Sequence, residues 1–173
     1  MTDLDRRMAL LESKVQRLCD IEDIRALRLR YHECVNQNRP ADIPDLFTED
    51  AELDFGYLGR TRGRVKITKF FAALPRLLDF VKQFVHNHVV EVDGDRGTGS
   101  SYLEAKSVSG GKAYRVAGRY LDLYVRTPQG WRFASMTFEP YFTVPHDESW
   151  AQADLLQMGR RTPADSGRRD SGS

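Results

Sequence analysis

The residues best suited to acid–base chemistry lie in one polar stretch, QFVHNHVVEVDGD, at positions 83–95. Alternation along this stretch predicts a β-strand in which His86 and His88 share one face and Gln83 occupies the other. A histidine facing a cavity could carry a proton near neutral pH, whereas the Gln83 amide could only orient or stabilise a polar group. A structural role fits both histidines as well, and a β-bulge would exchange the two faces.

Three further polar residues stand among apolar ones. Glu139 lies in the aromatic run FEPYF at 138–142, where a carboxyl group could donate or accept a proton. An exposed position at a strand end explains Glu139 equally well. Tyr31 is the polar-tipped member of an apolar helical stripe and could act as a general acid, and Asn36 follows at the end of the same helix.

The elements that must position these side chains begin with helices. An N-terminal helix over 1–18 is predicted by apolar residues at heptad spacing: Leu4, Met8, Leu11, Val15 and Leu18. This stripe suits either packing on the chain's own domain or a subunit contact. Asp20 is expected to cap a second helix, with the apolar stripe Ile21, Ile24, Leu27, Tyr31 and Val35. A short helix at 41–47, a strand at 51–57 and a helix at 64–80 kinked at Pro75 follow.

Long alternating segments joined by tight turns make up the second half of the chain. After the strand at 83–95, further strands are predicted at 97–108, 112–126 and 131–142. Such a succession is an antiparallel meander, so the fold class is α+β with helices on one face of the sheet. The domain spans 19–145; a short docking helix at 146–159 and a disordered tail at 160–173 are expected to follow.

Composition narrows the classes of partner. The formal net charge is +1, which argues against nucleic acid or an anionic membrane as the main partner. The charged N-terminus is unlike a signal peptide, so we expect a cytoplasmic protein. Cys19 and Cys34 are read as small buried helix residues, and His32 and His146 as surface residues. No metal-type spacing or phosphate loop occurs, so we expect neither metal nor cofactor.

The chain resembles the SnoaL-like family, which has the cone-shaped fold of nuclear transport factor two. The matching segments follow the family's order: DIEDIRALRLRY (20–31), LFTEDAELDFG (46–56), HNHVVEVDGD (86–95), GRYLDLYVR (118–126) and GWRF (130–133). The layout is also similar to that of bile-acid dehydratase and, more distantly, scytalone dehydratase and hexachlorocyclohexane dehydrochlorinase. This resemblance implies a curved antiparallel sheet with the N-terminal helices on its concave face, a pocket between them, and a homodimer or homotrimer.

The resemblance implies that those lyases use a catalytic Asp–His dyad, and this chain lacks both residues of the dyad. By position the Asp falls on Asn36 and the His on Gln83, while a family tyrosine falls on Tyr31. Neither amide titrates in water, so neither can serve as a general base. Loss of the base would slow a proton abstraction by about 10²–10⁴-fold, which argues against an unchanged dehydratase mechanism.

Two functional hypotheses follow. The first is a cofactor-independent cyclase, isomerase or lyase acting on a hydrophobic polycyclic or polyketide-like molecule. In it Tyr31 donates or polarises, Asn36 and Gln83 orient, and Glu139 or His86 carries any proton. The second is a non-catalytic small-molecule-binding or assembly protein that has lost the dyad. Seven residues are predicted to line the pocket: Phe55, Tyr57, Phe70, Phe84, Tyr102, Tyr120 and Met136.

Overall fold

The computed structural model describes residues 2–148, which form two α-helices, three 3₁₀ turns and six strands. In chain order these are α1 (Asp3–Asn36), η1 (Pro40–Asp42), η2 (Pro44–Leu46), β1 (Phe47–Asp54), η3 (Gly56–Leu58), β2 (Arg60–Arg62), α2 (Arg64–Leu77), β3 (Phe80–Asp93), β4 (Arg96–Ser109), β5 (Lys112–Thr127) and β6 (Gly130–Pro145). The predicted tail and almost all of the predicted docking helix lie outside the described residues.

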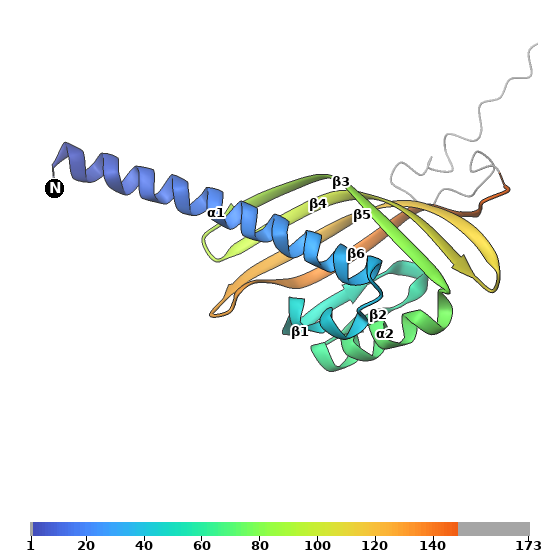
Figure 1. Cartoon of the computed structure of the whole chain (residues 1–173). Helices are drawn as coiled ribbons and strands as arrows, with labels where there is room; N and C mark the ends of the chain where they lie inside the picture. The colour runs from blue at the N-terminus through green and yellow to red at the C-terminus, as the bar shows by residue number, and fades with distance from the viewer. Residues whose placement is uncertain (1, 149–173) are drawn as a thin grey trace, which may run out of the picture.

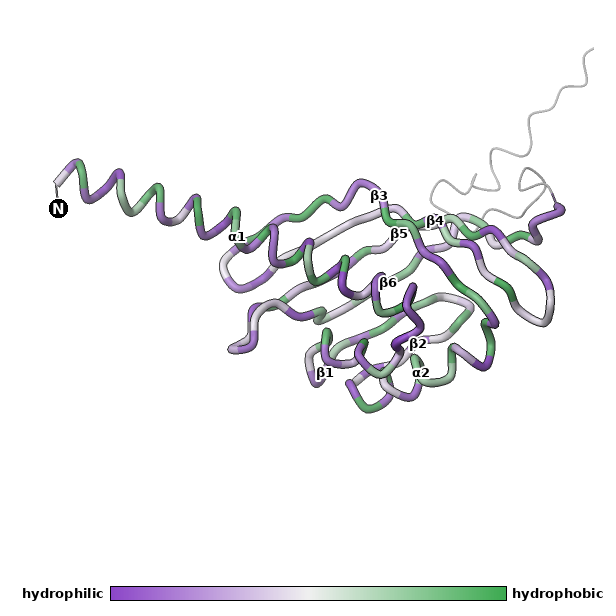
Figure 2. Tube along the Cα trace, viewed as in Figure 1, coloured by the Kyte–Doolittle hydropathy of each residue, from purple (hydrophilic) through white to green (hydrophobic). Residues whose placement is uncertain are grey.

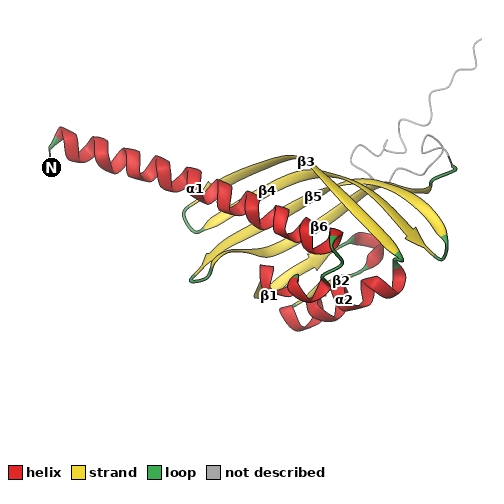
Figure 3. Ribbon diagram, viewed as in Figure 1, coloured by secondary structure: helices red, strands yellow, loops and turns green. Residues whose placement is uncertain are grey.

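A single curved sheet carries the domain, with strand order β2-β1-β6-β5-β4-β3 (Figures 1 and 3). The long strands β3 to β6 form the predicted antiparallel meander, whereas β1 pairs parallel with β6. The second half of α1 crosses the concave face, and α2 lies beside β1 and β2 (Figure 1). The α+β prediction is therefore confirmed, and the sheet is mixed at the β1–β6 pair.

The core lies between the concave face of the sheet and the two helices. Ile24, Tyr31, Phe47, Phe71 and Phe133 are at most 1% exposed and form its centre. Apolar and polar segments alternate along the chain in Figure 2, as expected for strands and helices that each bury one side.

A glycine in β4 brings the helix close to the sheet. A Cβ atom on Gly97 would lie 2.9 Å from Cδ1 of Ile24, so the absence of a side chain permits this approach.

The helical region differs from the prediction because α1 is one continuous helix rather than two. Thr2 caps it with a complete capping box: the Asp5 N–H donates to Thr2 Oγ1 (3.1 Å), and the Thr2 N–H donates to Asp5 (2.6 Å). No Gly or Pro interrupts residues 3–36, so no local signal ends the helix at residue 18. The predicted cap at Asp20 is therefore wrong.

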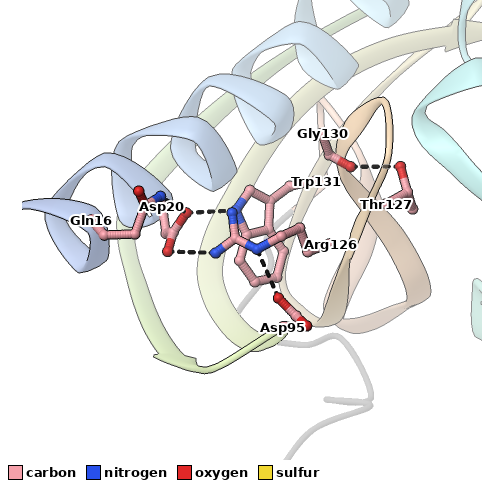
Figure 4. Close-up of polar contacts among 7 residues, drawn as sticks. All are labelled: Gln16, Asp20, Asp95, Arg126, Thr127, Gly130 and Trp131. Carbon is pink, nitrogen blue, oxygen red and sulfur yellow. Dashed lines mark hydrogen bonds and ion pairs between the residues drawn. The ribbon is translucent and has the colours of Figure 1, made fainter. Parts of the chain in front are cut away.

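Asp20 instead anchors α1 to the ends of the β-hairpins (Figure 4). Its carboxylate accepts hydrogen bonds from Gln16 (3.1 Å), Arg126 (2.6 Å) and the Trp131 indole (3.2 Å). Arg126 also pairs with Asp95 at 2.9 Å and lies over the Trp131 ring. The Arg126 hydrogen bond is the main reason that the pKa of Asp20 is lowered. These contacts fix α1 at the point where it leaves the domain.

The N-terminal half of α1 does not lie on its own domain. Every residue from 2 to 19 is exposed, and Figure 1 shows this half projecting beyond the sheet. Cys19 is exposed, contrary to the prediction, whereas Cys34 is buried as expected. The first of the two alternatives for the heptad stripe, packing on the chain's own domain, is wrong.

Smaller differences concern the loops and boundaries. Pro40 and Pro44 start 3₁₀ turns where a short helix was predicted, and Phe47 already belongs to β1. Strand β2 was missed because it has only three residues. Helix α2 ends at Leu77, with Pro75 in its last turn, so residues 78–80 fall outside the helix.

Candidate functional site

A cavity of about 370 Å³ lies between the end of α1, the end of α2, the 3₁₀ turns and strands β3 to β6. Its wall is mostly apolar. Five of the predicted site residues line it: Tyr31, Phe55, Tyr57, Gln83 and Tyr120. Among the described residues that line it, the only charged side chain is Arg39, and there is no carboxylate or imidazole.

Four predicted wall residues lie elsewhere. Phe84 and Tyr102 are each 49% exposed and lie on the outer face of the sheet, because the alternation of β3 and β4 turns them away from the helices. Phe70 packs edge-on against Phe55 and Phe71 without lining the cavity. Met136 is fully buried, with its sulfur 3.8 Å from an Arg28 nitrogen. All four predictions are therefore wrong as cavity positions.

Strand β3 contains a β-bulge, a possibility that the sequence did not decide. Asn87 has a φ of +49°, and the register with β4 shifts between His86 and Val89. His86 precedes the bulge and points outward, with its side chain 52% exposed and Nε2 4.0 Å from Glu104. His88 points inward, with Nε2 3.3 Å from the Tyr124 hydroxyl. The prediction that both histidines share one face is wrong.

Glu139 also lies outside the cavity. Its neighbour Phe138 lines the wall, so Glu139 points to the other face of β6. There it accepts a hydrogen bond of 2.6 Å from Arg119 Nε and is partly exposed. Glu139 and His86 are therefore not placed to exchange a proton with a molecule in the cavity.

Asn36 does not face the cavity but holds the backbone of β3. Its Nδ2 donates to the Gln83 carbonyl oxygen (2.9 Å), and its Oδ1 accepts from the Gln83 N–H (2.7 Å). Both ends of the amide are thus used in one paired contact. Lys82 adds a hydrogen bond from Nζ to the Asn36 carbonyl oxygen. Of residues 31, 36 and 83, only the first and last line the cavity.

The Gln83 side chain is held by a residue that the sequence analysis placed on the surface. His32 is only 4% exposed, and its Nδ1 lies 2.9 Å from Gln83 Oε1. Because this amide oxygen only accepts, Nδ1 carries the hydrogen in this contact. Burial, and secondarily the charge of Arg28, lowers the pKa of His32 to about 3, so the imidazole is neutral. The surface prediction for His32 is wrong, whereas His146 is exposed as predicted.

Two buried tyrosines form part of the cavity wall. Tyr31 and Tyr120 are each 1% exposed, with ring centroids 6.1 Å apart. Burial raises the pKa of both phenols, and the charge of Arg28 opposes the rise in each. The pKa of Tyr120 reaches about 12, with hydrogen bonds from Tyr31 and Gln83 as smaller opposing effects. Both hydroxyl groups therefore stay protonated and can donate hydrogen bonds.

A buried ion pair beneath α1 was not predicted from the sequence. The Arg28 guanidinium donates to Asp122 in β5, and the Tyr124 hydroxyl donates to the same carboxylate at 2.7 Å. Both charged side chains are fully buried, and Arg28 lies over the rings of Tyr120 and Phe133. Burial raises the pKa of Asp122 against the opposing effect of Arg28. The sequence did contain a signal for this pair, because Arg28 lies four residues after Ile24 of the apolar stripe and therefore on the same side of the helix.

The inward histidine predicts a loss of stability in mild acid. Burial, with the nearby charges of Arg28 and Arg25, lowers the pKa of His88 to about 4. The folded state therefore favours the neutral ring, while the unfolded chain takes up a proton below about pH 6.5. This contribution is complete above pH 6.5 and is lost towards pH 4, with a slope of up to about 1.4 kcal/mol per pH unit.

Urea denaturation at several pH values tests this expectation. His88→Gln should reduce the slope between pH 6.5 and 4.5, whereas the matched variant His86→Gln should leave it unchanged because His86 is exposed. Equal slopes in wild type and His88→Gln would contradict the assignment of His88 to the interior. His32, whose pKa is also lowered, contributes equally to every variant in this comparison.

No helix within residues 2–148 is long and apolar enough to cross a membrane. In the same residues, no three His, Cys, Asp or Glu side chains come together as a metal site would require.

Residues 16–137 match the model of the SnoaL-like domain, and the chain belongs to that family. It is 32% identical over 133 residues to the uncharacterized protein Rv2910c of Mycobacterium tuberculosis, covering 75% of this chain and 88% of that protein.

Solved structures share the fold at lower identity. A scytalone dehydratase-like protein from Novosphingobium aromaticivorans superposes with a TM-score of 0.71 at 18% identity, covering 84% of this chain and 97% of the other. Hexachlorocyclohexane dehydrochlorinase LinA-type3 from Novosphingobium barchaimii gives 0.63 at 20% identity, covering 86% and 97%. The family has dehydratase-like structural neighbours, and at these identities the likeness is one of fold.

Proposed function

We propose that the protein is a cofactor-independent cyclase or isomerase that acts on a hydrophobic, oxygen-bearing small molecule of polycyclic or polyketide-like type. One observation carries this proposal: helix α1 holds Gln83 at three atoms beside the apolar cavity. His32 fixes its side-chain oxygen, and Asn36 fixes its backbone N–H and carbonyl. His32 and Asn36 lie one helical turn apart, so a single rigid element orients the whole residue.

Because His32 binds Oε1 of Gln83, the amide nitrogen of Gln83 is left for other contacts. That nitrogen has two N–H donors, so one can serve a ligand even when Tyr120 takes the other. A donor oriented in advance in an apolar site stabilises negative charge that develops on a substrate oxygen. This is the contribution that a polarised carbonyl needs in a cyclisation or an isomerisation.

Reactions that need little proton transfer to the protein suit this cavity best. Its described wall offers hydrogen-bond donors and apolar surface but no side chain that is a base near neutral pH. Orientation of the reacting groups and hydrogen bonding to a developing oxyanion can both act without such a base. Removal of a proton by an Asp–His dyad, as in a dehydratase, is not supported by this wall.

A panel of hydrophobic ketones and enones tests the proposal, with binding followed by thermal shift and conversion by mass and absorbance. Cyclisation or isomerisation preserves mass while changing retention time or spectrum, whereas loss of water or halide would indicate a lyase. A compound that the wild type converts should be converted far more slowly by Gln83→Leu. Conversion that is indifferent to Gln83 would contradict the proposed site.

For a converted substrate, we expect kcat to be constant from about pH 5 to 9. The pKa of His32 is lowered to about 3 and that of Tyr120 is raised to about 12, and the Gln83 amide does not titrate, so none of these three groups changes charge in this range. A stopped or continuous assay across buffers measures the profile. A limb near pH 6 to 7 would instead implicate a titrating histidine and overturn this assignment.

The second candidate function is binding without conversion. The observation that favours it is the lack of a carboxylate or an imidazole among the described residues of the wall. In that case a ligand should raise the melting temperature, lose this effect in Gln83→Leu, and be recovered chemically unchanged after prolonged incubation.

A further inference from the structure

The projecting half of α1 carries an unpartnered apolar stripe. Its five residues, Leu4, Met8, Leu11, Val15 and Leu18, are between 49% and 66% exposed. We propose that residues 4–18 form a parallel, two-stranded coiled coil with the same segment of a second copy of this chain. This interface is independent of the cavity function proposed above.

The projecting part of α1 has no packing partner among the described residues. Residues 3–19 make a regular helix without burying any of their side chains, although isolated helices of this length are marginal in water. The capping box at Thr2 and Asp5 secures its free end but supplies only local stabilisation. A second helix packed on the stripe would supply the missing burial.

The direction of the stripe permits such a partner. Adjacent residues of an α-helix are about 100° apart, so Leu18 and Asp20 lie about 200° apart around α1. Asp20 faces the sheet and is 3% exposed, whereas Leu18 is 64% exposed. The stripe therefore points away from the sheet, and a second helix can approach without meeting the domain.

The stripe also ends where the domain begins. The next two positions of the heptad are Glu22 and Arg25, which pair with each other on the same helix at 2.5 Å. Charged residues at these positions stop the apolar seam after Leu18.

The residue types favour two strands. In heptad notation Met8 and Val15 occupy a positions, and Leu4, Leu11 and Leu18 occupy d positions. Val15 at an a position with leucine at every d position is typical of parallel dimers, whereas the unbranched Met8 adds no such preference.

Charge complementarity selects the parallel direction. The flanking g positions hold Arg7 and Lys14, and the e positions hold Asp5 and Glu12. In a parallel pair, Arg7 of each copy faces Glu12 of the other, which is attractive. In an antiparallel pair, Arg7 would face Lys14, and Asp5 would face Glu12, so both flanks would repel.

Sedimentation or light scattering of the full chain over a concentration series tests the dimer. Leu11→Glu should raise the dimer dissociation constant by about 100-fold or more, because two leucines leave the seam. Leu10→Glu is the matched control: Leu10 and Leu11 are 56% and 55% exposed, but Leu10 lies off the stripe. A monomeric wild type, or a dimer that survives Leu11→Glu, would overturn the proposal.

A single cysteine variant distinguishes a parallel from an antiparallel pair of helices. In a Cys19→Ser background, Leu18→Cys should crosslink to its own copy on oxidation, because the two d positions meet in a parallel pair. In an antiparallel pair the same two residues would lie more than about 20 Å apart, and no crosslink would form. Arg7→Glu should weaken the dimer, and adding Glu12→Arg should restore it. A dimer strengthened by Arg7→Glu would contradict the parallel arrangement.

Discussion

Replacing Asp122 by asparagine is expected to lower the free energy of unfolding by about 3–5 kcal/mol. The substitution preserves the shape of the side chain but leaves the fully buried Arg28 guanidinium without its counter-charge. Domains of this size are usually stable by only about 5–15 kcal/mol, so a large fraction of the stability depends on this contact. Urea denaturation followed by circular dichroism gives the difference directly.

A double variant shows that the loss comes from an uncompensated charge. Arg28→Met with Asp122→Leu should be more stable than Asp122→Asn, because no buried charge remains and apolar side chains fill the space. Glu52→Gln, which removes an exposed ion pair with Arg62, should have little effect. If Asp122→Asn were as stable as Glu52→Gln, the pair would contribute nothing to the fold.

Gln83→Leu is expected to reduce kcat on a converted substrate by about 10²–10³-fold, as removal of an oxyanion-stabilising donor does in other enzymes. The backbone contacts with Asn36 persist in this variant, because they use only main-chain atoms of Gln83. The fold should therefore survive, although His32 loses its acceptor at a cost of about 1–3 kcal/mol. Steady-state kinetics should show the change in kcat rather than in KM.

Tyr57→Phe is the matched control for that measurement. Tyr57 also lines the cavity, but it is 56% exposed, and its hydroxyl bonds to Thr143 at 2.9 Å. Removing this hydroxyl should leave kcat nearly unchanged. Equal losses in both variants would point to a general disturbance of the cavity, and no loss in Gln83→Leu would remove Gln83 from the site.

The fold could be predicted from the sequence because its signals are periodic and local. The meander strands appear at their predicted places, since alternation and tight turns specify them without distant contacts. The continuity of α1 could not be inferred from Asp20, because a potential capping residue can equally well bind partners far along the chain, here Arg126 and Trp131.

The candidate site was predicted only in part, for physical reasons that individual residues illustrate. The sequence allowed a bulge in this strand but did not decide whether one forms, and the bulge at Asn87 reversed the face of His88. His32 looked like a surface residue because a polar side chain next to a stripe is usually solvated, whereas here Gln83 accepts its hydrogen in the interior. Gln83 and Tyr31, by contrast, do line the cavity.

The Asn36 amide has a consequence for solubility that is separate from any role at the cavity. Strand β3 ends the strand order and has no neighbouring strand beyond it among residues 2–148, so its outer main-chain groups could recruit a foreign strand. By occupying both the N–H and the carbonyl of Gln83, Asn36 blocks that border where apolar Phe80 and Phe84 lie exposed nearby. One helix side chain thus occupies two main-chain groups that an added strand would need, which disfavours edge-to-edge pairing at Gln83.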